Sequence, residues 1–229
     1  MNESITLGKT QSDAQRKFIS SVYLRMFTAL IVTAAAAYFT ASSQTMVKLI
    51  YGSYFAYVFV IAEIVLVITL SAALNKLSVF AATVLFYLYA AVNGVTLSSI
   101  FLLYSIHSIT QVFVGSAIMF LAMSAYGMVT STDLSKYVHF FGMAFIGIIS
   151  ISVMNILLKS SAIEWGISIL CVALFAGLTA YHTQRLVRNS AKADGSEASQ
   201  KSSIYASLRL YLDFINIFIR LIRLFGKRR

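Results

Sequence analysis

Proline is absent from this chain of 229 residues, and cysteine occurs once, at Cys171. Without proline, no helix can be kinked by a missing backbone donor, and a single cysteine excludes a disulfide within the chain. Charge is scarce as well. Asp, Glu, Lys and Arg make up 11% of the residues, whereas they are about a quarter of a soluble domain. So little charge cannot cover a surface that faces water, which argues against a soluble enzyme.

Apolar sequence takes the place of the missing charge. Hydrophobic residues make up 59% of the chain, and the mean hydropathy is +0.82. A helix that crosses a bilayer needs about 20 apolar residues, and open strands would leave unpaired edges in lipid. We therefore predict an all-α, polytopic membrane bundle of seven transmembrane helices in a lipid bilayer. The apolar runs lie at 21–41, 54–73, 79–103, 109–129, 138–158, 165–186 and 204–225.

This prediction divides the chain into a polar N-terminal tail at 1–20, a transmembrane domain at 21–225 and a basic C-terminal tail at 226–229. With the N-terminus in the cytoplasm, eleven Lys and Arg of the first six spans lie inside and two lie outside, which fits the positive-inside rule. This topology accounts for the net charge of +10, so we predict no nucleic-acid partner. Five more basic residues follow Asp213. The last run therefore either crosses against the rule or re-enters, and we favour a crossing.

Two acidic residues, Glu63 and Asp213, lie near the middle of apolar runs. Insertion scales place the cost of an aspartate at a helix centre at about 2.5–3.5 kcal/mol. Such residues are expected to face the interior of the bundle and to find partners there. Each has two interpretations: a structural hydrogen bond to a neighbouring helix, or an ion or proton site.

A histidine is the candidate partner of Asp213. His182 lies near the end of its run, where a lone histidine is commonly just solvated or hydrogen-bonded. The runs that carry His182 and Asp213 both meet the polar stretch 187–203, which we predict to be the longest loop and mobile. The two runs are then antiparallel neighbours, and an aspartate beside a histidine can share protons near physiological pH.

Several stretches of the chain also carry a family resemblance. They are LFYLYAAVNGVTLSSIFLLYSIHSIT, SAYGMVTSTDLSKY, VMNILLKSS, LFAGLTAYHTQRL and LYLDFINIFIRLIRLFG. Together they resemble the bacterial branch of the Bax inhibitor (TMBIM, YccA/YetJ-like) membrane family. The resemblance implies six helices around a central C-terminal helix, a pH-sensitive calcium leak and a place in the bacterial inner membrane. It implies neither enzymatic activity nor a cofactor.

The resemblance also implies site residues. In the family, one aspartate from each of the last two spans shares a proton, and Asp213 matches the second of them. Glu63 matches an acidic position linked to the ion path. The family's AYDTQ is AYHTQ here, so that His182 replaces the first aspartate, and a basic latch residue of one relative is missing near Leu74. Calcium prefers several anionic oxygens, so we predict only a weak calcium contact, at Asp213. The pH transition should lie nearer the histidine reference of about 6.5.

Two other hypotheses belong to different classes of function. Some bacterial relatives bind and restrain a membrane-anchored quality-control protease, and the polar tail at 1–20 is the feature that could do so here. An intramembrane enzyme built on Glu63 and Asp213 lacks the Gly-rich context that such sites use, and no P-loop, GxSxG or HExxH motif occurs. We favour the leak.

Overall fold

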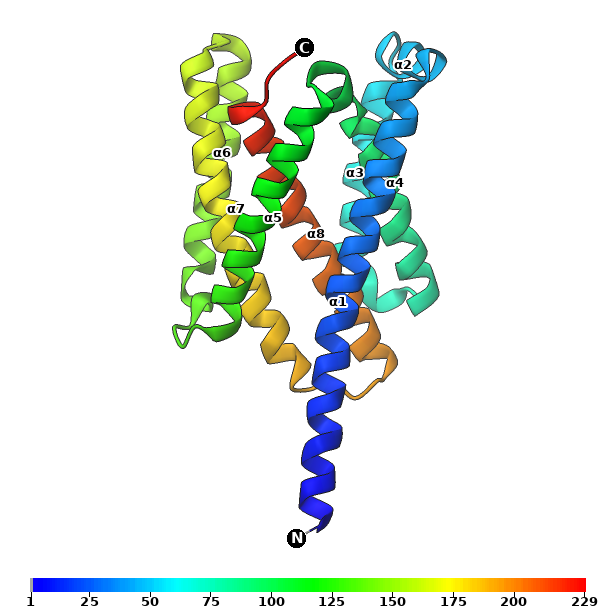
Figure 1. Ribbon diagram of the computed structural model, residues 1–229, viewed down its shortest axis with the longest axis vertical. Helices are drawn as coiled ribbons and strands as arrows, with labels where there is room; N and C mark the ends of the chain where they lie inside the picture. The colour runs from blue at the N-terminus through cyan, green and yellow to red at the C-terminus, as the bar shows by residue number, and fades with distance from the viewer. Residues whose placement is uncertain (1) are drawn as a thin grey trace. The chain divides into compact units, whose positions relative to one another are not determined.

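The structure is a computed structural model that describes residues 2–229, with the side chains of residues 12–229 apart from Asn75. The described chain is almost entirely helical (Figure 1). The helices in chain order are α1 (Asn2–Ser42), α2 (Gln44–Tyr51), α3 (Phe55–Ala72), the 3-10 turn η1 (Leu74–Lys76), α4 (Val79–Leu103), α5 (Ile106–Val129), the 3-10 turn η2 (Leu134–Tyr137), α6 (Val138–Leu158), α7 (Ser161–Ser190) and α8 (Glu197–Phe225).

Six helical segments of the described chain are long and apolar enough to cross a membrane. They are Ser12–Ser42, Phe55–Ala72, Val79–Leu103, Ile106–Val129, Leu134–Leu158 and Ser161–Ser190. The seventh predicted run coincides with α8, which carries six charged residues and lies outside this set. A crossing by α8 therefore stays a prediction.

Large apolar side chains cover much of the surface. In the most apolar stretches of α3 and of the segment Leu134–Leu158, only 6% of the residues are buried inside the protein. Side chains such as Phe80 and Leu157 are 79% and 83% exposed. A soluble monomer rarely exposes apolar patches of such extent, whereas a bilayer covers them. The protein is accordingly a multi-pass membrane protein.

The chain forms two compact units. The first contains Met1–Leu103 and Val187–Tyr211, and the second contains Tyr104–Leu186 and Leu212–Arg229. In the first unit α1 and α3 both pack on α4. The α1–α4 contact is close because Gly94 lies against the backbone of Thr33, where a Cβ atom would clash.

The second unit is held by another close approach and by its C-terminal tail. Gly127 of α5 lies against the backbone of Ala180 in α7, so that no side chain fits between them. The tail is fixed where α5 begins: the backbone N–H of Lys227 donates to Ser108 Oγ at 2.9 Å, and Tyr104 pairs with Arg228 in an isolated bridge.

The polar ends of the helices differ from the sequence prediction. The predicted loop at 187–203 is too long, because α7 continues to Ser190 and α8 begins at Glu197; its mobility stays a prediction. The helix α1 begins at Asn2, so the predicted polar tail at 1–20 is continuous with the first span, and the division of the chain at residue 20 stays a prediction; the side chains of residues 1–11 lie outside the described residues. Hydropathy reports where a helix can contact lipid, and a polar sequence can extend the same helix beyond that region. The apolar runs at 79–103 and 138–158 coincide with α4 and α6.

Candidate functional site

A histidine and an aspartate form the main candidate site, within the second unit. Nδ1 of His182 on α7 lies 2.6 Å from Oδ2 of Asp213 on α8. The side chain of Asp213 is 3% exposed and that of His182 is 14% exposed. The acid is therefore buried beside a titratable base, and the imidazole is the more accessible of the two partners.

Aromatic packing positions α8 around Asp213. The ring of Phe214 packs edge-on against Phe113 and Phe120 of α5, with ring centroids 5.2 and 5.7 Å apart. Phe218, one turn later, also contacts Phe113. Such edge-to-face pairs add to the energy of burial, so they hold the helix that carries the carboxylate against α5.

The two residues before His182 and the two after it fix α7 around the imidazole. Ala180 meets Gly127 of α5, as described above, and the ring of Tyr181 lies 5.3 Å from the imidazole. Thr183 shares a hydrogen bond with a serine of α5, with 3.1 Å between the oxygens of Ser124 and Thr183.

Gln184 also holds this part of α7, through two hydrogen bonds to the segment that precedes α6. Its Oε1 accepts from the backbone N–H of Leu134 at 2.9 Å, and its Nε2 donates to the carbonyl of Thr132 at 2.7 Å. The AYHTQ segment is thus attached to α5 and to the turn that precedes α6. The imidazole is held by its neighbours rather than by its own contact with Asp213 alone.

The chemistry of the pair follows from this contact. At 2.6 Å between a ring nitrogen and a carboxylate oxygen, one proton lies between the two atoms. The pair carries one negative charge when Nε2 of His182 is unprotonated, and it is neutral when both ring nitrogens carry protons. One proton taken up at the imidazole therefore changes the charge inside the protein by one unit.

The third predicted residue, Glu63, belongs to the first unit. It lies on α3 and faces the side chains of Asn93 and Thr96 on α4. Its Oε1 is buried and is the one such side-chain atom in the described part of the chain without a hydrogen-bond partner. Glu63 thus has neutral neighbours and an oxygen that is free to accept a further hydrogen bond.

A second polar group of the first unit was missed by the sequence analysis. Tyr211 is fully buried, and its hydroxyl lies 2.7 Å from Thr33 Oγ1 and donates to Asn93 Oδ1 at 3.0 Å. Thr33 Oγ1 also lies 2.9 Å from the carbonyl oxygen of Ala90. Tyrosines of membrane proteins commonly lie at the interface, so the sequence offers no signal that this one is internal.

A preformed calcium cage is not present among the described side chains. No group of three or more His, Cys, Asp or Glu is arranged to hold a metal there. Calcium takes six to eight oxygen ligands, and Asp213 supplies two carboxylate oxygens. The predicted calcium contact at Asp213 stays a prediction.

Comparison with known proteins gives the family. Residues 15–229 match the family described as Inhibitor of apoptosis-promoting Bax1. The chain is 44% identical over 215 residues to inner membrane protein YbhL of Escherichia coli strain K12, with 93% of this chain and 92% of the relative covered. It is 40% identical over 227 residues to an uncharacterized protein of Borreliella burgdorferi, with 98% of each chain covered. Uncharacterized protein YrjE of Lactococcus lactis is 34% identical over 230 residues, with 99% of this chain and 97% of the relative covered. The chain belongs to the Bax inhibitor family of integral membrane proteins.

Proposed function

We propose that this protein is a pH-sensitive leak pathway for calcium, in which His182 and Asp213 form the proton-sensitive element. The observation that carries the proposal is the 2.6 Å contact between the imidazole and the buried carboxylate. An ionisable group inside a membrane protein is costly, and it commonly marks an ion or proton route. A titratable partner at hydrogen-bond distance adds a means of changing the charge of that route.

The sign of the pH effect follows from the charge of the pair. While the imidazole carries one proton, the pair is anionic and attracts a divalent cation. When the imidazole takes up a second proton, the pair is neutral, and a full ion pair also holds α7 against α8. Both effects oppose calcium passage, so the flux should fall on acidification.

Calcium is the cargo of this proposal rather than a resident ligand. Asp213 offers too few oxygens to retain the ion, and Glu63 offers a second carboxyl group in the first unit. A route for ions needs sites that bind weakly enough to release them. Partial coordination at single carboxylates is consistent with that need.

The proposed topology has α8 as the seventh crossing, with the N-terminus in the cytoplasm. Two contacts within the second unit support it. His182 meets Asp213 towards the C-terminal end of α7, and Glu164, at the start of α7, lies 3.8 Å from Arg223 near the end of α8. The two helices are therefore antiparallel over much of their length. The similarity to inner membrane protein YbhL of E. coli supports the bacterial inner membrane as the location.

Flux measurements in liposomes test this function. Purified protein is reconstituted, and calcium, potassium and proton fluxes are compared at pH 5.5 and 8. We expect calcium flux that is severalfold higher at pH 8, and a ratio near one in the Asp213→Asn variant, which removes the charge at nearly constant shape. Asp13→Asn, which removes an exposed carboxylate of α1, is the matched control. Calcium flux that is equal in native and Asp213→Asn protein at both pH values would contradict the proposal.

A further inference from the structure

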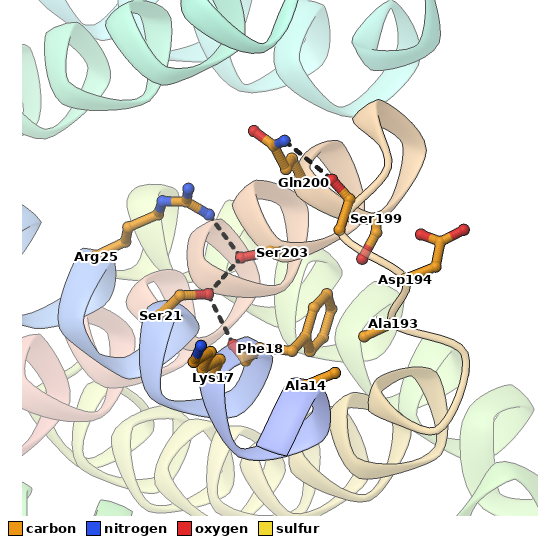
Figure 2. A pocket seen from close by; sticks show the side chains of 11 residues that line it. Ala14, Lys17, Phe18, Ser21, Arg25, Ala193, Asp194, Ser199, Gln200 and Ser203 are labelled. Atoms are coloured by element: carbon orange, nitrogen blue, oxygen red, sulfur yellow. Dashed lines mark hydrogen bonds between the residues drawn. The ribbon is translucent and has the colours of Figure 1, made fainter. Parts of the chain in front are cut away.

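A pocket of about 380 Å³ lies within the first unit, away from every residue assigned above (Figure 2). One wall is the early part of α1, between Ala14 and Arg25. The other wall is the segment 193–203, which contains the end of the α7–α8 turn and the first two turns of α8. The pocket therefore lies between the junction of the predicted tail with the first span and the predicted loop at 187–203.

Two cations of α1 face this pocket. Lys17 is exposed, and Arg25, two turns further along, is half-buried. Nη1 of Arg25 donates to Ser203 Oγ at 2.6 Å, and this oxygen lies 3.0 Å from Ser21 Oγ. Figure 2 shows this row of polar atoms, from Arg25 through Ser203 to Ser21, along one side of the pocket.

Lys17 and Arg25 share the pocket lining with the carboxylate of Asp194 but are not paired with it. None of the ion pairs among the described residues joins either of them to a carboxylate. Glu197, at the start of α8, is paired with Lys201 at 2.8 Å. The walls of the pocket thus keep two positive charges available.

Asp194 supplies the one carboxylate of the described lining. It accepts the backbone N–H of Ser196 at 2.9 Å, and hydrogen bonds from Ser196 hold the pKa of this exposed carboxyl below its usual range. In Figure 2 it lies across the pocket from Arg25. The remaining walls are apolar or neutral, with Phe18, Ala14 and Ala193 beside the serines and Gln200.

The position of the pocket along α1 indicates which part of the membrane it faces. The apolar run of α1 begins at about residue 21, so Lys17 precedes it and Arg25 lies in its first turns. Lys and Arg at the end of a span lie at the level of the lipid headgroups, where anionic phosphates gather. A guanidinium, an ammonium and two hydroxyls form a donor set that suits phosphate oxygens.

We propose that this pocket binds a phosphate group, with Lys17 and Arg25 as its cations and Ser21 and Ser203 as neutral donors, and that an anionic phospholipid headgroup supplies it. Free phosphate carries the same chemistry from water. Because the pocket walls come from α1 and from the start of α8, the bound anion holds these two segments together within the first unit.

Thermal unfolding of the full-length protein in neutral detergent tests the proposal. The midpoint is followed at constant ionic strength against three probes: dihexanoylphosphatidylglycerol, dihexanoylphosphatidylcholine and inorganic phosphate. We expect a saturable rise with the anionic lipid and no rise with the zwitterionic one. A comparable rise with inorganic phosphate, in competition with the lipid, would support the phosphate site and assign it to the free ion.

Variants test which residues act. Lys17→Gln removes a charge that makes no internal hydrogen bond and should weaken binding about threefold or more, and the double variant with Arg25→Gln should weaken it at least tenfold. Arg16→Gln removes a neighbouring exposed charge outside the pocket and should change binding less than twofold. Asp194→Asn should tighten binding, because it removes a like charge. Equal stabilisation by both lipids, no stabilisation by either anion, or unchanged affinity in Lys17→Gln would overturn the proposal.

Discussion

The two buried polar centres differ in how their acid is satisfied. In the second unit, Asp213 lies 2.6 Å from His182, a group that can take up a proton. In the first unit, Glu63 lies beside neutral side chains and keeps one buried oxygen without a partner. The nearby hydroxyl of Tyr211 is saturated by Thr33 and Asn93 instead.

The difference separates structural polar groups from groups that can switch. Hydroxyl and amide groups stay neutral at every physiological pH, so a hydrogen bond between them holds helices together but does not respond to protons. A pair of a carboxylate and an imidazole can change its net charge, because the imidazole can take up a proton. Under the proposed function, the proton response belongs to the second unit and the Thr33–Asn93–Tyr211 network has a packing role, with Glu63 as a carboxyl group open to a further partner.

Gly127→Ala should have the largest effect on stability. The added Cβ would meet the backbone carbonyl of Ala180, and backbone cannot yield as a flexible side chain can. We expect the free energy of unfolding to fall by about 2–3 kcal/mol. The pH response should also change, because α7 would be displaced at Ala180, which is two residues before His182. Unfolding in detergent and liposome flux measure both. Gly115→Ala, on an open face of the same helix, is the control and should change neither; a stable Gly127→Ala protein with the native pH profile would show that this contact does not position the pair.

Tyr211→Phe should have an intermediate effect that is confined to stability. It deletes the hydroxyl that donates to Asn93 Oδ1, while Thr33 keeps its contact with the carbonyl of Ala90, at a cost of about 1–2 kcal/mol. The pH midpoint of calcium flux should not move, because no titrating group is removed in the physiological range. Tyr54→Phe, at a side chain that is 84% exposed, serves as the control. A shifted midpoint in Tyr211→Phe would break the division of roles between the two units.

Glu63→Gln should have the smallest effect on stability. The carboxyl oxygen that it replaces makes no hydrogen bond, so the free energy of unfolding should change by less than about 0.5 kcal/mol. Asp213→Asn removes a bonded partner and should cost about 1–3 kcal/mol. The two variants are compared by unfolding in the same detergent. If they destabilise the protein equally, the two acids do not differ in the way described here.

The sequence predicts the apolar spans better than it predicts the polar contacts between helices. The apolar runs of α4 and α6 coincide with those helices because lipid contact requires an uninterrupted apolar sequence. The contact of His182 with Asp213 agrees with the argument that the two runs are antiparallel neighbours because both meet the stretch 187–203; their role as a proton sensor stays a prediction. The bond between Thr33 and Tyr211 joins residues 178 positions apart, and nothing local in either segment indicates the other.

The sequence also did not predict how far the helices extend at their polar ends, for a related reason. Hydropathy marks residues 187–203 as outside the membrane, but only helix propensity and side-chain capping decide how far α7 and α8 extend into that stretch. The proposed phosphate pocket lies among such residues, with Ser203 contributed by the first turns of α8. If residues 187–203 are taken as a loop, the sequence does not predict where Ser203 lies relative to Arg25.

The pH profile of calcium flux tests the central claim most directly. Native protein, His182→Asp and His182→Asn are reconstituted in parallel, and flux is measured from pH 5 to 8. We expect a one-proton transition near the imidazole range in the native protein, a transition displaced to lower pH in His182→Asp, and no transition in that range in His182→Asn. Three superimposable profiles would contradict the account, because the histidine would then have no part in the proton response.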